Sequence, residues 1–126
     1  MAQFVERRKY RRFEIPGGKV NIARFRGYSF FKPFSAHYPL LNICMGGLNI
    51  LSTREFSTGE DLLLELHAPD EKVIRLRSKV IWTNPIAISK DTLIGFEFFP
   101  FGEDKHLNPH EAMHVLRRLY ARYIET

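Results

Sequence analysis

Asp61–His67 reads DLLLELH, and after the turn residues Ala68, Pro69 and Asp70 the chain continues as VIRLRSKVIW over residues 73–82. The first half of the second stretch alternates apolar side chains with arginine, which is the pattern of a half-buried strand. The proline and aspartate between the two stretches favour a turn. These residues therefore predict two successive β-strands.

The rest of the first hundred residues follows the same pattern. Further short segments have strand character: residues 19–26, 37–43, 48–51 and 92–99, the last of them stopped by Pro100. Short strands at this spacing favour an antiparallel β-barrel or sandwich over alternating strand and helix units. We expect about six strands between residues 16 and 102.

The end of the chain predicts a helix over residues 108–126. Asn108 is a typical N-cap residue, Pro109 suits the first helical position, and Glu111 stands at the capping-box position. Apolar residues then recur at helical spacing and form one stripe: Ala112, Val115, Leu116, Leu119, Tyr120 and Tyr123. The expected fold is all-β with one packed C-terminal helix.

Length and composition indicate one globular domain over residues 1–126. The net charge of +5 favours partners that carry phosphate. The single cysteine, Cys44, excludes an internal disulfide. No apolar run approaches the ~20 residues that a membrane span needs, and the first residues do not resemble a signal peptide, so we expect a cytoplasmic protein without a membrane span.

Residues 6–12 read ERRKYRR, so five of seven side chains are cations that repel one another. Arginine forks onto phosphate oxygens and also stacks on a purine ring. Residues 16–18 (PGG) predict a turn that separates this run from the strands, which gives a flexible basic arm over residues 1–15. A solvated arm without a ligand is the alternative interpretation of the charge run alone.

A second motif is NICMGG, residues 42–47. Asn42 offers a donor and an acceptor, which can read a base edge. Gly47 permits either a close approach of the backbone to a ligand or a positive φ. The alternative is a hairpin turn with an Asx-type hydrogen bond, which by itself explains the same residues.

Taken together, these segments resemble the PilZ domain family. Residues 8–12 (RKYRR) are similar to the family's RxxxR motif, and residues 42–47 are similar to its (D/N)xSxxG motif. Residues 80–82 (VIW) and 94–98 (IGFEF) resemble its V-x-W and G-x-x-F strands. The residues from Phe56 to Gly59 before an apolar strand add to the likeness, which covers nearly the whole chain.

The resemblance implies a six-stranded antiparallel β-barrel that binds cyclic di-GMP. By this likeness Arg8 and Arg12 hold phosphate and guanine from the arm, while Asn42, Cys44 and Gly47 line the barrel surface that receives the ligand. Arg7 could stack on a second guanine, so that two intercalated ligands bind. The expected protein is a receptor and adaptor whose arm changes conformation on binding and signals to a protein partner.

Two features depart from the family pattern. Cys44 stands where serine is usual, and a thiol is a weak hydrogen-bonding group, so affinity should fall by about 1 kcal/mol. The interval from Arg12 to Asn42 is also long, with the excess around residues 28–34 (YSFFKPF). These aromatics either pack onto the barrel or form a partner surface.

Other readings stay open or are weak. One alternative is a degenerate PilZ-like adaptor that acts by protein contacts without the ligand. Another is a small basic barrel that binds single-stranded nucleic acid. Because the positive charge lies in a tail, no stable nucleic-acid complex is expected. His110 and His114 lack a third metal ligand, so we expect neither a metal nor a cofactor. Cys44 has no partner pattern for a nucleophile, so an enzyme is not expected. Trp82 is predicted to lie in the core.

Overall fold

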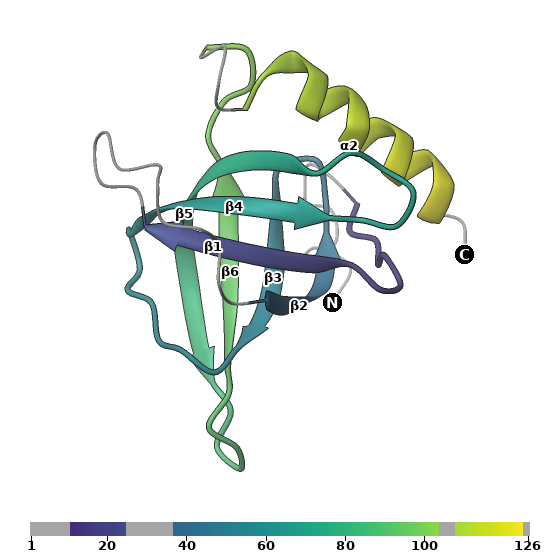
Figure 1. The fold of residues 1–126 in the computed structure, drawn as a ribbon. Helices are drawn as coiled ribbons and strands as arrows, with labels where there is room; N and C mark the ends of the chain where they lie inside the picture. Colours follow the sequence, from purple (N-terminus) through teal and green to yellow (C-terminus); the bar gives the residue numbers. More distant parts are fainter. Residues whose placement is uncertain (1–10, 25–36, 104–107, 125–126) are drawn as a thin grey trace.

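The computed structural model describes residues 11–24, 37–103 and 108–124. Six strands follow in chain order: β1 Lys19–Arg24, β2 His37–Ile43, β3 Gly47–Ser52, β4 Asp61–His67, β5 Ile74–Pro85 and β6 Thr92–Phe98. Their antiparallel pairs close a barrel in the order β1-β2-β3-β6-β5-β4, and helix α2, His110–Tyr123, lies across one end of it (Figure 1). The predicted six-stranded barrel with a single C-terminal helix is confirmed.

Alternation along each strand builds the core. In β4, for example, Leu62, Leu64 and Leu66 are fully buried, while Glu65 and His67 between and after them lie on the outer face. The same rule fills the barrel from all six strands, and the helix adds the residues of its apolar stripe: Ala112, Val115, Leu116 and Leu119. Barrel and helix therefore share one hydrophobic core.

Two β-bulges interrupt the ladders, one between Leu40 and Asn42 and the other between Val80 and Trp82. Strict alternation from the buried Val80 would point Trp82 into the barrel. The extra residue in β5 instead places Trp82 opposite Gly95 on the outer face, where it is half-buried. A Cβ on Gly95 would collide with the indole ring. The prediction that Trp82 lies in the core was wrong for this reason.

The flexible arm was predicted over residues 1–15, and its last residues instead belong to the barrel. Phe13 and Ile15 are buried, and Phe13 forms a β-bridge with Ile43 at the end of β2. The Phe13 ring also meets Tyr120 of α2 edge-on, with 5.6 Å between the ring centroids. The chain is therefore part of the barrel from Phe13 onward, and residues 1–10 lie outside the described residues.

The N-cap prediction for Asn108 was also wrong. Pro109 precedes the helix as its cap residue without a side-chain hydrogen bond, and Asn108 has a φ of 51°. The buried Asn108 amide donates to the carbonyl oxygens of Arg77 and Phe99, at 3.0 and 2.7 Å, and accepts from the Arg77 backbone N–H. Its side chain thus connects the segment before α2 to the first half of β5 and to the residue that follows β6.

Asn108→Ala should lower the free energy of unfolding by about 2–4 kcal/mol, because the substitution removes the hydrogen bonds that the buried Asn108 side chain makes with the Arg77 N–H and the Phe99 carbonyl. Urea denaturation measures the change. Asn84→Ala, at an exposed position of β5, is the matched control and should change stability by less than ~0.5 kcal/mol. Equal effects of the two substitutions would contradict the assigned role of Asn108.

Candidate functional site

A polar groove of about 540 Å³ lies where three separate parts of the chain meet. Its lining residues come from the segment before β1, from β2 and from the end of α2: Arg11, Arg12, Phe13, Glu14, Pro16, Asn42, Tyr123 and Ile124. Two of the predicted site residues, Arg12 and Asn42, are therefore brought together. Arg7 and Arg8 lie outside the described residues.

Main-chain pairing sets this arrangement. The Phe13 N–H donates to the Ile43 carbonyl and the Ile43 N–H donates to the Phe13 carbonyl, both at 2.8 Å. Because neighbouring side chains of an extended chain point to opposite sides, burial of Phe13 turns Arg12 outward. Burial of Ile43 likewise turns Asn42 outward beside it.

The exposed cations of the groove are available for an anionic ligand. Arg11 and Arg12 are exposed, and no carboxylate of the described residues forms an ion pair with either guanidinium. Glu14 lines the same groove but is also exposed. Two exposed guanidinium groups beside an amide form a surface suited to phosphate oxygens and base edges.

Cys44 and Gly47 do not line this groove. The Cys44 N–H donates to the Gly47 carbonyl at 2.8 Å, and the Gly46 N–H lies 3.4 Å from Cys44 Sγ, which acts as its acceptor. The Phe98 N–H donates to Gly46 at 2.9 Å. These contacts make a compact β2–β3 turn in which the thiol has a local role.

Gly47 is required by packing between strands. Its φ is not positive, and a Cβ at this position would collide with the Phe96 carbonyl of β6. The close approach that the sequence indicated is therefore one between β3 and β6 rather than one toward the groove.

The outer face of β3 contributes a residue that the sequence reasoning missed. The Asn49 side-chain N–H donates to Asn42 Oδ1 at 2.6 Å. Reasoning from motifs also left out Arg11, Glu14, Tyr123 and Ile124 as groove residues. Arg11 and Glu14 could have been found from their position beside Arg12, whereas Asn49 depends on the bulged β2–β3 register.

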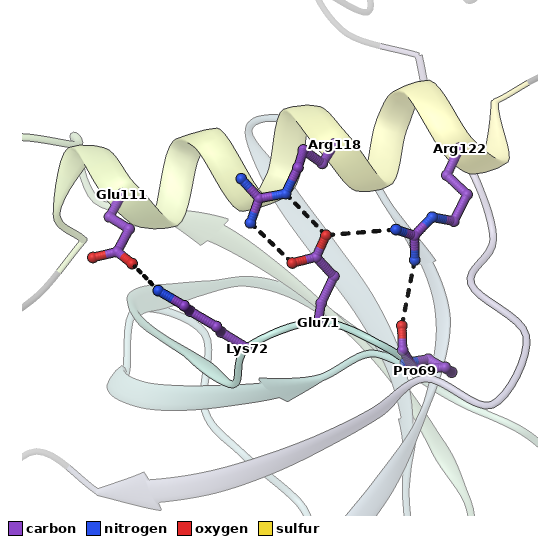
Figure 2. A network of polar contacts seen from close by, with 6 residues as sticks. All are labelled: Pro69, Glu71, Lys72, Glu111, Arg118 and Arg122. Carbon is purple, nitrogen blue, oxygen red and sulfur yellow. Dashed lines mark hydrogen bonds and ion pairs between the residues drawn. The ribbon is translucent and has the colours of Figure 1, made fainter.

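An ion-pair network holds α2, which supplies the third wall of the groove (Figure 2). Glu71, in the β4–β5 connection, accepts from Arg118 Nε and Nη2 at 3.0 and 2.9 Å, and Arg122 Nη2 lies 3.7 Å from it. Lys72 donates to Glu111 at 2.9 Å. The side chain of Glu71 is only 7% exposed, and hydrogen bonding from Arg118 lowers its pKa below the ordinary value.

The histidines of α2 do not form a metal centre with other described residues. Within residues 11–24, 37–103 and 108–124, no group of three or more potential ligands is placed to hold a metal ion. The His110 ring instead packs over Gly102, where a Cβ would collide with it. Among the same residues, no helix has the length and apolarity to cross a membrane.

Comparison with known proteins identifies the fold. The family model for the PilZ domain matches residues 6–112. This chain belongs to the PilZ domain family. A search of curated protein sequences found no match. The PilZ match includes both motifs and the groove residues from Arg11 to Asn42, but ends before Tyr123 and Ile124. PilZ domains are binding and adaptor domains.

Three solved structures share the fold. Escherichia coli YcgR in complex with c-di-GMP superposes with a TM-score of 0.67 at 17% identity, over 92% of this chain and 45% of that one. Bacillus subtilis inhibitor of motility (MotI/DgrA) gives 0.66 at 19% identity, over 92% and 51%. The isolated YcgR PilZ domain with c-di-GMP gives 0.58 at 13%, over 92% and 96%. The chain therefore spans about half the length of the first two proteins.

Gly47→Ala should destabilise the ligand-free protein by about 1–3 kcal/mol, because the added methyl group collides with the Phe96 backbone. Chemical denaturation measures this loss. Gly18→Ala is a graded control, since its methyl group would lie 3.1 Å from the Ile15 carbonyl and should cost less. A Gly47→Ala protein of wild-type stability that no longer binds ligand would show that the glycine serves the ligand instead.

Glu71→Gln should reduce stability most near neutral pH. The folded-state pKa of Glu71 is lowered, so the folded protein binds fewer protons than the unfolded chain below pH ~4.5, and the contribution of Glu71 is lost as the pH falls through its folded-state pKa. The difference between wild type and variant, measured by denaturation from pH 7 to pH 3, should therefore shrink with acidification. Glu55→Gln, at an exposed position outside the network, is the control. A difference that does not change with pH would rule out the Arg118–Glu71 contact as its source.

Proposed function

We propose that this chain is a receptor for cyclic di-GMP that signals to a protein partner. The proposal rests on the groove in which the exposed Arg11 and Arg12 lie beside Asn42. Membership of the PilZ family supports it, as do the two neighbours whose structures contain c-di-GMP. We expect a cytoplasmic protein that uses no cofactor besides this ligand and catalyses no reaction.

The proposed mechanism starts from the fixed position of Arg12. The backbone of Phe13 is paired with Ile43, so Arg12 stands directly before an anchored residue, whereas Arg7 and Arg8 precede it in the basic run. A ligand with two phosphate charges would offset the repulsion within this run and draw the preceding residues over the groove. Ordering of the arm would create a new surface for the partner.

The individual residues have distinct proposed roles. Arg8 and Arg12 would hold phosphate and guanine, Arg7 would stack on a second guanine, and Asn42 would contact a base edge. Cys44 and Gly47 would act indirectly, because they shape the turn that follows Asn42. A cysteine in place of serine would lower the affinity by a small amount, because a thiol is a weak hydrogen-bonding group.

The alternative of a single-stranded nucleic-acid binder has less support. That function needs exposed aromatic rings on which bases stack. Among the described residues no phenylalanine, tyrosine or tryptophan ring is exposed. The rings of Phe13, Tyr38, Phe56, Phe96 and Phe98 are buried, and those of Trp82, Phe99, Phe101, Tyr120 and Tyr123 are half-buried. The adaptor that acts without ligand remains the reading that direct binding data would favour if cyclic di-GMP fails to bind.

Arg8→Ala and Arg12→Ala should each weaken cyclic di-GMP binding by at least ~1.5 kcal/mol, about tenfold in Kd, because each substitution removes a charged hydrogen bond. Titration calorimetry measures both affinity and stoichiometry. Arg54→Ala is the matched control, since Arg54 is exposed and follows β3 at the end opposite Gly47.

If the wild-type protein binds no cyclic di-GMP at millimolar concentration, the receptor hypothesis is refuted and the ligand-independent adaptor is favoured. Wild-type affinity in Arg12→Ala would refute the groove as the site. A stoichiometry of one ligand per chain would remove the stacking role of Arg7, without affecting the other assignments.

A further inference from the structure

The amide of Asn42 is held in one orientation by a neighbour on the next strand. Asn49 lies on the outer face of β3, opposite Gly95 of β6, and is only 8% exposed. Its Nδ2 donates to Asn42 Oδ1 at 2.6 Å. With this bond in place, the oxygen end of the Asn42 carboxamide faces β3.

The topology then determines where the other end of the amide faces. One edge of β2 pairs with β3, and the opposite edge receives Phe13 through its bridge to Ile43. Because the carboxamide is planar and its oxygen is directed toward β3, its amino group is directed to the other side, toward the segment that carries Arg11 and Arg12. The groove therefore receives the donor end of Asn42.

We infer that Asn49 is a positioning residue that sets base preference in this groove. The inference rests on the proposed function. Guanidinium groups only donate, and the Asn42 amino group adds a donor to the groove wall that they line, whereas Glu14 on the same wall is an acceptor. Guanine presents two adjacent acceptors, N7 and O6, whereas adenine presents N7 beside a donor amino group. The orientation set by Asn49 favours guanine over adenine at this wall.

Glu14 is an acceptor that lines the same groove. It could contribute to base preference independently of Asn42. For this reason the test compares substitutions at position 49, which leave Glu14, Arg11 and Arg12 unchanged.

Asn49→Asp reverses the bond. A carboxylate only accepts, so the Asn42 amino group turns toward position 49 and the carbonyl oxygen faces the groove. We expect the ratio of the Kd for cyclic di-AMP to the Kd for cyclic di-GMP, measured by titration calorimetry, to fall about tenfold. Asn49→Ala releases the amide without reversing it, and should lower the ratio only several-fold.

Asn21→Ala is the matched control, because Asn21 is a buried asparagine on the outer face of β1 with a side-chain contact to His67. It should leave the ratio unchanged. Both dinucleotides carry two phosphates, so repulsion between a new carboxylate and the phosphates changes both Kd values alike and cancels in their ratio. Far-UV circular dichroism and thermal melting establish that each variant is folded.

The orientation also has a readout without ligand. The Asn42 side-chain amide hydrogens should exchange rapidly with water in wild type and become protected in Asn49→Asp, as followed by two-dimensional ¹H–¹⁵N NMR. Protected Asn42 amide hydrogens in wild type would overturn the assigned orientation. A folded Asn49→Asp protein with the wild-type ratio would overturn the specificity role. Wild type that binds neither dinucleotide would overturn the proposed function and the specificity role together, while the NMR signals would still decide the orientation.

Discussion

The two main-chain hydrogen bonds between Phe13 and Ile43 bring Arg12 and Asn42 together at the candidate site. They attach the end of the basic run to the last residue of β2, on the edge whose first residues pair with β1. The Phe13 ring then enters the core and contacts Tyr120 of α2. Without this bridge, Arg12 and Asn42 would have no fixed relation, since thirty residues separate them in the sequence.

The groove depends on three segments that are distant in sequence. Glu71 of the β4–β5 connection holds the helical wall through ion pairs with Arg118 and Arg122 of α2 (Figure 2). The strand wall is held by the Asn42–Asn49 bond and by the turn through Cys44 and Gly47. A ligand that contacts all three segments would link the N-terminal residues to the end of α2, which is a suitable arrangement for a module that reports binding to a partner.

Much of the fold could be predicted because burial on one face of a strand imposes period-two alternation. The strands at residues 37–43 and 61–67 have the predicted bounds. Alternation fails at a bulge, which is why Trp82 was misplaced. Asn108 matched a local capping pattern, but its partners Arg77 and Phe99 are set by the tertiary fold. The site shows the same division: Arg12 and Asn42 follow from motifs, whereas Asn49, Tyr123 and the packing role of Gly47 depend on register and on the position of α2.

The most direct test of this account is a ¹H–¹⁵N NMR titration of the wild-type chain with cyclic di-GMP. We expect the largest shift changes at the groove residues Arg11, Arg12, Asn42, Tyr123 and Ile124, and unchanged signals at Ser89 and Asp91 in the β5–β6 hairpin. Changes centred on another face of the barrel, with the groove signals unmoved at saturation, would contradict it.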